Sequence, residues 1–557
     1  MQIMAMETGR ATGWAPRRKR ARTGGSAMMA RTARIPTLKN VSPLRVVFIR
    51  PPRHYWPILN ESDNFLLPLA YPTLAAYLRE HMTDIELTIL DCCVEKMGYA
   101  SLERRLAHDQ PDVICIGEKV VYAHEALKTF KLARSVVPNA ILIAGGVFFT
   151  PQTAYTFEHC PEIDFIVKHE GEETLRELLE TLRAGAAPWD VRGIAYHRDG
   201  RTVETAPRPL IQDLDSLPFP AYDLAGVERY APFGHLWPNA ATVQRARGCI
   251  DECRFCSWWV QESEQRWDGK EWAPRKRVRS KSPKRMVEEI DWLYTDFNIR
   301  YLFWVDATWN IDDDWLNAFC DEIIRRKYDL GWWAFFRVDR VQEQHRNGTL
   351  ERMVRAGLRH VLVGVERAET SDVESLAKHR YTREKTREAF HILARHYPEV
   401  FRQGTFITGL PDDDEASIKD LLNYAHECNL DFAAFHPLTP FPGTPLFEEV
   451  IQSPLLEERE FHRYDMFYPV LRTKYLTREE VAALTTWCQQ NFVGKKPGRF
   501  FQRLLSPHAV RRRLHWWFLY AISRVMVQDM LLALAGRKAF QGFAGVNSLW
   551  KPSWYES

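Results

Sequence analysis

The sequence predicts an α/β protein with an N-terminal doubly wound, Rossmann-like domain, a partial (β/α)6 barrel and a helical C-terminal region. Two observations predict this fold class. Short apolar runs alternate with amphipathic stretches over residues 44–185, and the alternation returns in six units between 241 and 450. We therefore divide the chain into a disordered basic tail at 1–43, the Rossmann-like domain at 44–185, a linker at 186–240, the barrel at 241–450 and a helical domain at 451–557.

The composition is that of a soluble globular protein, with 45% hydrophobic and 26% charged residues. A net charge of only +3 argues against wholesale nucleic-acid binding. No export signal is visible, and Met28 and Met29 offer later start sites. The longest apolar stretch, Leu514–Ala535, is interrupted by polar residues, so we expect a helix that touches a bilayer or packs on the barrel mouth. The expected location is the cytoplasm.

In the first domain, strands and helices alternate as in a doubly wound parallel sheet. Ligands of such sheets bind at the carboxyl ends of the strands. Gly145, Gly146 and Glu170 follow two of these strands, which makes them candidate cofactor-binding residues. The expected strands are Arg45–Ile49, Glu86–Leu90, Val113–Ile116, Ala140–Ala144 and Phe165–Val167, and a hairpin is expected around Asp199-Gly200 in the linker.

The second half repeats strand and helix signals six times, which is typical of a parallel barrel with its chemistry at the strand carboxyl ends. The expected strands are Ala241–Ala246, Tyr301–Val305, Trp332–Val338, His360–Val365, Gly404–Thr408 and Ala433–Leu438. Polar residues follow several of these strands, and they are the candidates for cofactor contacts.

Three of the ten cysteines are clustered, at Cys249, Cys253 and Cys256, directly after the first expected barrel strand. A [4Fe–4S] cluster ordinarily takes four cysteines, so three thiolates leave one iron open for an external ligand. A structural zinc site is the alternative, but such sites usually carry a second Cys or His pair, and the sequence has no second pair.

The CxxxCxΦC spacing, with Phe255 before the last cysteine, resembles the cluster motif of radical S-adenosylmethionine (SAM) enzymes. The resemblance implies that the open iron binds SAM and that an electron carrier of the flavodoxin or ferredoxin type reduces the cluster. By the same resemblance Arg337 pairs with the SAM carboxylate, Glu366 and Asp306 contact SAM, and Gly409 lies beside the adenine. An ordinary salt bridge or strand-to-helix turn is the alternative at each position.

The first domain resembles a cobalamin-binding module, which implies cobalamin as a further cofactor near Gly145, Gly146 and Glu170. Many cobalamin proteins carry Asp-x-His-x-x-Gly, but this chain has Cys93 in place of the histidine. We therefore expect base-off cobalamin without a protein imidazole. Ligation by Cys92 or Cys93 and a degenerate domain without cobalamin are the alternatives.

The order of the three regions resembles cobalamin-dependent C-methyltransferases and the anaerobic magnesium-protoporphyrin monomethyl ester cyclase. We expect C-methylation of an unactivated carbon in a bulky hydrophobic substrate such as a tetrapyrrole or polycyclic lipid, with oxidative ring closure as the alternative. An RNA-modifying enzyme would want a second cysteine triad, which the sequence does not show. A non-catalytic cobalamin or iron–sulfur sensor also stays open, and it would bind the cluster without cleaving SAM.

Overall fold

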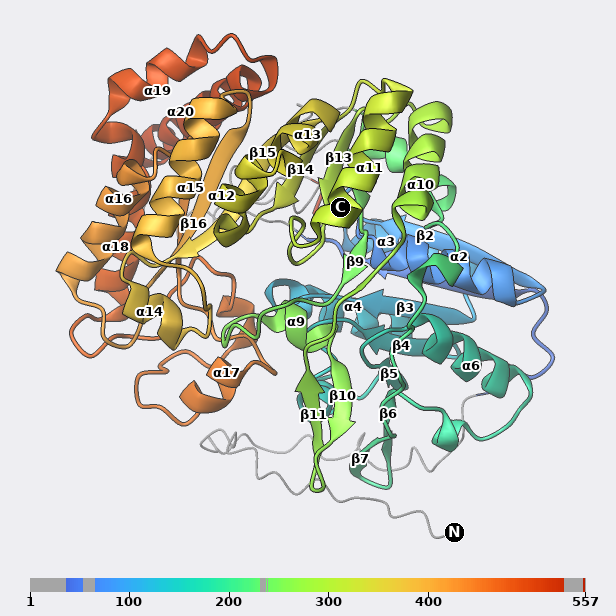
Figure 1. The fold of residues 1–557 in the computed structure, drawn as a ribbon. Coiled ribbons are helices and arrows are strands. Elements are labelled where there is room, and N and C mark those ends of the chain that lie inside the picture. The colour runs from blue at the N-terminus through green and yellow to red at the C-terminus, as the bar shows by residue number, and fades with distance from the viewer. Residues whose placement is uncertain (1–36, 54–65, 231–236, 238, 535–553, 556–557) are drawn as a thin grey trace.

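A computed structural model describes residues 37–53, 66–230, 237, 239–534 and 554–555. The expected tail at 1–43 therefore lies mostly outside the described residues. Two sheets organise the described part of the chain, a mixed sheet of seven strands and a parallel sheet of six (Figure 1). This arrangement confirms the predicted fold class.

The seven-stranded sheet has the order β2-β1-β3-β4-β5-β6-β7, and its first five strands are parallel. Its strands are β1 (Leu44–Arg50), β2 (Ile85–Asp91), β3 (Val113–Gly117), β4 (Ile141–Gly145), β5 (Phe165–Val167), β6 (Ile194–Arg198) and β7 (Arg201–Glu204). The accompanying helices are α2 (Ala70–His81), α3 (Tyr99–Asp109), α4 (Ala123–Val136), α5 (Thr153–His159) and α6 (Glu172–Arg183).

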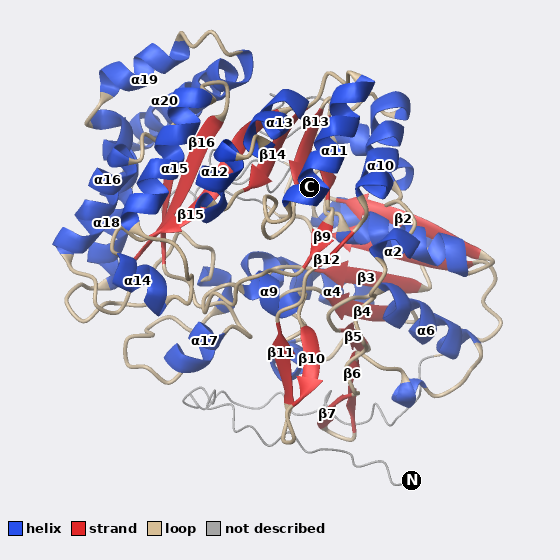
Figure 2. Cartoon of the chain, viewed as in Figure 1, coloured by secondary structure: helices blue, strands red, loops and turns tan. Residues whose placement is uncertain are grey.

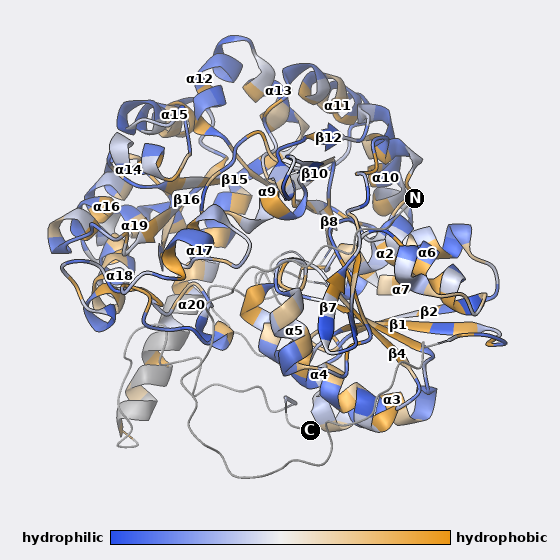
Figure 3. Ribbon diagram, turned by 90° about the horizontal axis from the view of Figure 1, so that it is seen from below, coloured by the Kyte–Doolittle hydropathy of each residue, from blue (hydrophilic) through white to orange (hydrophobic). Residues whose placement is uncertain are grey.

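Alternating side chains on the strands explain why helices cover both faces of this sheet. Phe48 packs in one apolar cluster with Leu178 of α6, whereas its neighbour Ile49 packs in another with Leu102 of α3 and Phe130 of α4. Figure 3 shows the apolar strands β1 and β4 lying between helices whose outer faces are hydrophilic. Both faces are therefore buried, as in a doubly wound domain.

The expected hairpin forms at Asp199 and Gly200, which both have positive φ. It does not stand apart in a linker, because β6 pairs antiparallel with β5 and extends the first sheet. The segment that follows contains the short helix α7 (Tyr222–Ala225).

The six-stranded sheet has the order β17-β16-β15-β14-β13-β8, which is the chain order reversed, and every pairing is parallel. The strands curve into an open half-barrel with helices outside (Figure 2). Its strands are β8 (Ala240–Val243), β13 (Tyr301–Trp304), β14 (Gly331–Phe335), β15 (Leu358–Glu366), β16 (Phe401–Thr408) and β17 (Phe432–Pro437). Its helices are α10 (Pro283–Asp296), α11 (Asp313–Arg326), α12 (Val338–Arg346), α13 (Thr349–Ala356), α14 (Thr370–Ser375), α15 (Arg383–His396), α16 (Glu415–Glu427) and α17 (Pro445–Val450).

The C-terminal region is helical, as expected, with α18 (Arg478–Gly494), α19 (Pro497–Leu504) and α20 (Ala509–Leu534). The predicted place of its last helix, at the barrel mouth, is wrong. Phe518 of α20 stacks on Phe432 at a centroid distance of 4.2 Å, and Phe432 is the first residue of β17. The helix thus covers aromatic side chains at the amino ends of the strands, opposite the mouth. Within the described residues, no helix is long and apolar enough to cross a membrane.

Candidate functional site

The cysteine loop begins where the first barrel strand ends and is shaped by its neighbours. β9 (Ala246–Arg247) pairs antiparallel with β12 (Arg279–Ser280), and Gly248 follows with a φ of +88°. A Cβ atom at Gly248 would overlap the carbonyl oxygen of Arg277. Only glycine fits this contact, so the loop is fixed by its backbone before any cofactor binds.

The three thiols lie on this loop without a disulfide partner. Cys253 is buried, Cys249 and Cys256 are half-buried, and Cys256 directly precedes α9 (Ser257–Gln261). The indole N–H of Trp259 donates to the Cys253 carbonyl oxygen at 2.9 Å. Burial raises the pKa of each thiol, that of Cys256 to about 11, so metal binding would have to displace the protons.

The described residues contain no group of three or more His, Cys, Asp or Glu side chains placed to hold one metal ion. The zinc alternative would need a fourth ligand on a single ion beside the three cysteines. A cluster is less demanding in this respect, because each thiolate binds a different iron atom. The cysteine loop is therefore compatible with a [4Fe–4S] cluster.

Arg337 lies two residues after the end of β14, directly before α12, and is 1% exposed. Its Nε and Nη2 donate to the two carboxylate oxygens of Asp339 at 2.9 and 3.0 Å, and its Nη1 donates to Asp251 of the cysteine loop. The guanidinium thus ties the loop to the end of the third barrel strand. Sequence reasoning located Arg337 at a strand end but gave no signal for these two aspartates.

Glu366 ends β15 with a φ of +65°, which is rare for a residue other than glycine. Its Oε1 accepts from Lys378 Nζ at 2.7 Å, and both side chains are buried. A Cβ at Gly364 would overlap Glu366 Oε1, so that glycine makes room for the pair. Such strain is characteristic of binding sites. Sequence reasoning missed Lys378, whose position in a polar loop carries no spacing signal.

Asp306 follows β13 and is fully buried. It accepts from the backbone N–H of Ala246 at 2.7 Å and of Arg245 at 3.3 Å. Burial raises the pKa of Asp306 to about 7, although the nearby Arg245 guanidinium opposes the shift. Asp306 therefore supports the strand that leads into the cysteine loop.

Gly409 follows β16 with a φ of +77°. Its N–H donates to Asp413 Oδ2 at 2.8 Å, and Arg367 also binds Asp413. A Cβ at Gly409 would lie 2.9 Å from Val481 Cγ1. The glycine forms a tight turn at the mouth of the half-barrel, held by buried charges.

The glycines at the end of β4 serve close backbone packing. A Cβ at Gly145 would lie 3.2 Å from the Val167 carbonyl oxygen, and one at Gly146 would lie 3.1 Å from the Glu118 nitrogen. Gly146 also has a φ of +87°. The two glycines therefore keep the carboxyl edge of the first sheet flat and without side chains.

The polar groups of the loop after β2 are paired with other groups of the chain. Asp91 is fully buried and accepts from Arg50 Nη1 at 2.9 Å, Tyr230 Oη at 3.0 Å and the Cys93 N–H at 3.0 Å. Burial raises the pKa of Cys93 to about 12, and its thiol lies 3.7 Å from the Pro51 carbonyl oxygen. A buried, protonated thiol is a poor metal ligand, which argues against axial ligation by Cys93.

Glu170 joins the two sheets. Its Oε1 accepts from Arg247 at 2.8 Å and from Arg279 at 2.9 Å, and Glu172 also binds Arg247 at 2.5 Å. Arg247 stands two residues before Cys249. The predicted cofactor residue is therefore engaged with two arginines that flank the cysteine loop.

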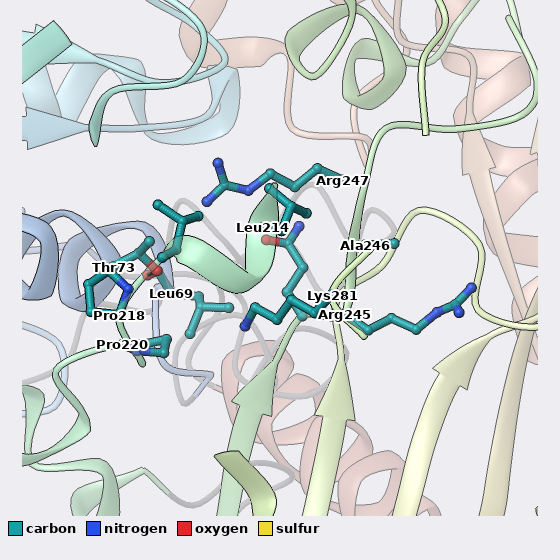
Figure 4. A pocket seen from close by; sticks show the side chains of 11 residues that line it. Leu69, Thr73, Leu214, Pro218, Pro220, Arg245, Ala246, Arg247 and Lys281 are labelled. Atoms are coloured by element: carbon teal, nitrogen blue, oxygen red, sulfur yellow. Dashed lines mark hydrogen bonds between the residues drawn. The ribbon is translucent and has the colours of Figure 1, made fainter. Parts of the chain in front are cut away.

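A small cavity of about 20 Å³ lies beside these pairs. In Figure 4, Leu69 and Thr73 face Arg247 and Lys281 across it, and Arg245 extends away. Such a volume holds about one water molecule, so it is not a cofactor site.

Comparison with known families identifies the domains that contain these two sheets. A profile described as the B12 binding domain matches residues 55–179, and one for the radical SAM superfamily matches residues 243–425. The chain joins a B12-binding domain to a radical SAM domain. Such an enzyme uses cobalamin, a [4Fe–4S] cluster and SAM.

Relatives and a solved structure align with most of the chain. An uncharacterized methyltransferase of Pyrococcus horikoshii is 28% identical over 423 residues, 75% of this chain and 85% of that protein. The anaerobic magnesium-protoporphyrin IX monomethyl ester cyclase of Cereibacter sphaeroides is 28% identical over 454 residues, 79% of this chain and 68% of that protein. The cobalamin-dependent SAM radical enzyme OxsB, solved with aqua-cobalamin and SAM bound, shares the fold with a TM-score of 0.65 and 14% identity over 91% of this chain and 78% of that chain.

Proposed function

We propose that this protein is a cobalamin-dependent radical SAM enzyme that methylates an unactivated carbon of a bulky hydrophobic substrate. The observation that carries the proposal is the loop of three unpaired thiols at the mouth of the half-barrel, in a chain that also has a B12-binding domain. Cys249, Cys253 and Cys256 would hold the cluster and leave one iron for the amino and carboxylate groups of SAM.

When bound, the cluster supplies the electron that splits SAM, and cobalamin supplies the methyl group. The residues of this chain position the reactants. Arg337 holds Asp251 and thereby the cysteine loop, and the Glu366–Lys378 pair offers a carboxylate and an ammonium for the polar groups of SAM. Gly409 leaves the turn beside them without a side chain.

The B12-binding domain would present a flat edge to the corrin ring. Gly145 and Gly146 contribute no side chains there, and the loop Asp91–Gly98 contains no histidine. Because the Cys93 thiol is buried and protonated at neutral pH, we propose base-off cobalamin without a protein ligand from this loop.

The inner face of the half-barrel supports a hydrophobic substrate. Phe335, Leu362 and Ile407 are half-buried on adjoining strands. Phe335 and Ile407 lie near the carboxyl ends of β14 and β16, and Leu362 lies beside Phe335 in the middle of β15. They alternate with residues that pack under the outer helices, so they face inward. A tetrapyrrole or a polycyclic lipid has the apolar surface to match.

Ring closure is the second candidate reaction, because the Cereibacter sphaeroides relative is named as a cyclase of magnesium-protoporphyrin IX monomethyl ester. The two reactions differ in their products. A methyltransferase incorporates a SAM methyl group into its substrate, whereas a cyclase does not.

The decisive experiment reconstitutes the protein anaerobically with iron, sulfide and hydroxocobalamin, and then adds dithionite and SAM. We expect a base-off cob(II)alamin EPR signal, a reduced cluster signal that shifts with SAM, and 5′-deoxyadenosine. Methyl-deuterated SAM and candidate substrates then separate methylation from ring closure by mass. Cluster binding without SAM cleavage would support a sensor and refute the enzyme.

A further inference from the structure

Large apolar side chains are exposed mainly on the last two described helices. Ten such side chains are exposed within the described residues, and seven of them lie on α19, on α20 or in the turn between them. The two helices lie together at one end of the half-barrel (Figure 1). Exposed apolar side chains are usually scattered over a protein surface, so this concentration indicates a binding surface.

The outer face of α20 carries five of these side chains in one line. They are Trp516, Tyr520, Val527, Met530 and Leu534. With Ser523, which is also exposed, they follow one another at intervals of three or four residues, so they form a single stripe along the helix. On the opposite face, Trp517 and Phe518 are buried in the apolar cluster that contains Phe432 of β17. The stripe therefore points away from the half-barrel.

The end of α19 adjoins this stripe. The indole N–H of Trp516 donates to the Leu504 carbonyl oxygen at 3.1 Å, and the exposed Leu505 follows directly in the chain. Phe501 is exposed one helical turn before Leu505. We call the stripe, together with Phe501 and Leu505, the helical surface.

The segment that carries the helical surface is strongly basic. Residues 495–528 contain eight Lys and Arg residues and no Asp or Glu. Two of the eight pair with the buried Asp431. Lys495, Lys496 and Arg513 are exposed, and none of them pairs with a carboxylate within the described part of the chain. Since the whole protein has a net charge of only +3, this positive charge is local.

Charged, aromatic and aliphatic side chains follow one another along α20. The exposed Arg513 lies one turn before Trp516, Tyr520 comes next, and aliphatic side chains occupy the rest of the stripe. Lipid phosphates attract cations, Trp and Tyr favour the boundary between headgroups and acyl chains, and aliphatic side chains favour the acyl region. The helical surface thus offers each layer of a bilayer surface a matching group.

We propose that the helical surface docks on an anionic membrane, with the stripe in the acyl boundary and the cations at the lipid phosphates. Burial of the apolar stripe and attraction to anionic lipid both contribute to such binding. Docking involves no residue of the cysteine loop, so it is independent of the reaction that the enzyme catalyses.

A second copy of the chain fits the helical surface less well. A symmetric dimer places the same patch of both copies in contact. Because residues 495–528 contain no acidic residue, neither copy would supply a carboxylate from this segment for the cations of the other. An anionic bilayer supplies negative charge and an apolar layer together.

The test uses the full-length protein and two kinds of vesicle, one of phosphatidylcholine alone and one of phosphatidylcholine and phosphatidylglycerol in equal parts. Flotation at low and high salt measures the bound fraction. Light scattering after gel filtration measures the molar mass in solution. Thermal unfolding checks that each variant is folded.

A charge variant tests the contribution of the cations. It combines Lys496→Glu with Arg513→Glu. The matched control combines Lys385→Glu with Arg387→Glu, two exposed cations of α15 that also pair with no carboxylate among the described residues. We expect the charge variant to bind the anionic vesicles at least about 10-fold more weakly at low salt, because anionic lipid repels the new carboxylates. The control should bind like the wild type.

A stripe variant tests the apolar contribution. It combines Tyr520→Gln with Val527→Gln, and its matched control combines Trp267→Gln with Trp272→Gln, two exposed tryptophans on a separate hairpin. We expect the stripe variant to bind at least about 10-fold more weakly at low and high salt alike, because salt does not screen apolar burial. The control should again bind like the wild type. The control hairpin consists of β10 (Glu264–Trp267) and β11 (Trp272–Arg275).

A wild-type protein that binds neither kind of vesicle would overturn the proposal. Unchanged binding in the charge or the stripe variant would also overturn it, as would equal weakening in the matched controls. A wild-type dimer that dissociates in the stripe variant, without vesicle binding by either protein, would overturn it in favour of a second copy.

Discussion

The carboxyl edges of the two parallel sheets are built differently. In the B12-binding domain the charged side chains at the edge neutralise one another: Asp91 binds Arg50 and Tyr230, and Glu118 lies 3.5 Å from Arg53. The edge of the radical SAM domain also carries ion pairs, Arg337 with Asp339 and Glu366 with Lys378, and in addition three cysteines that form no disulfide. The charged groups of both edges are thus matched within the chain, and the second edge adds a cluster of three thiols.

The scaffold of the second edge is nevertheless fixed. Backbone contacts at Gly248 and the ion pairs of Arg337 and Arg247 hold the loop, and none of them involves a thiol. The conformation of the loop is therefore set by these backbone contacts and ion pairs, and not by the three cysteine side chains.

Replacing a cluster ligand should abolish the cofactor and leave the backbone of the cysteine loop intact. Cys253→Ala should lose nearly all bound iron and sulfide and all 5′-deoxyadenosine formation, because two thiolates do not hold a four-iron cluster. Iron and sulfide analysis and product chromatography measure this, with Cys320→Ala, a buried thiol of α11, as the control. Equal iron content in the two variants would refute the assigned triad.

A substitution at Gly248 should disrupt the backbone of the cysteine loop. Gly248→Ala forces a Cβ onto the Arg277 carbonyl at positive φ, and we expect about 3 kcal/mol or more of lost stability with poor cluster incorporation. Gly269→Ala is the matched control, because its φ is +103° but its Cβ would meet nothing within 4 Å. It should cost only about 1 kcal/mol in denaturant unfolding. Similar costs for both would show that the close contact is unimportant.

The next largest effect is expected at Glu170, whose ion pairs link the two sheets. Glu170→Ala leaves the buried Arg247 and Arg279 without one shared carboxylate and should cost about 3 kcal/mol of the free energy of unfolding. Glu180→Ala, which removes an exposed pair with Arg176, should cost less than about 0.5 kcal/mol. Urea unfolding of both variants measures the contrast, and a cost below 1 kcal/mol for Glu170→Ala would contradict it.

Asp306 should make the radical SAM domain sensitive to pH. Its folded pKa of about 7 lies above the ordinary value of 3.8, so it contributes full stability below about pH 4 and loses it as pH rises toward 7. Asp306→Asn lacks this titration. The stability of the wild type relative to the variant should therefore fall by at most about 1.4 kcal/mol per pH unit in that range. A constant difference between pH 4 and 7 would refute the assignment.

The smallest effect is expected at the carboxyl edge of the first sheet, where charged side chains neutralise one another. Tyr230→Phe removes one of the hydrogen bonds to the buried Asp91 but leaves Arg50 in place, so it should cost about 1 kcal/mol and leave cobalamin binding unchanged. Thermal unfolding and the absorbance of bound cobalamin measure the two properties. Loss of cobalamin at unchanged stability would mean that Tyr230 contacts the cofactor.

Much of the fold was predictable because the local pattern of apolar residues indicates where strands and helices lie. The ends of all five parallel strands of the first sheet and of three of the six barrel strands lie within two residues of the expected positions, since buried strands read as short apolar runs. The short helix α5 escaped prediction, because seven residues barely span two turns.

Only the part of the site that is formed by a local sequence motif, the three cysteines, was predictable. The cysteine spacing is local, but the partners of Arg337, Glu170 and Asp91 come from segments 77 to 139 residues away or from loops without periodicity. The helix α20 was placed at the wrong end of the barrel for the same reason. Its aromatic residues predict burial, and only tertiary packing decides against which end of the strands.

The pairs between Glu170 and the two arginines also have a thermodynamic consequence. A ligand that shifts the loop after β5 moves Arg247, and with it the segment entering Cys249. Such a shift would link the two cofactor sites by a coupling free energy, so that occupancy of either site would change the affinity of the other by the same factor. Cobalamin titrations with and without the assembled cluster would give that factor directly.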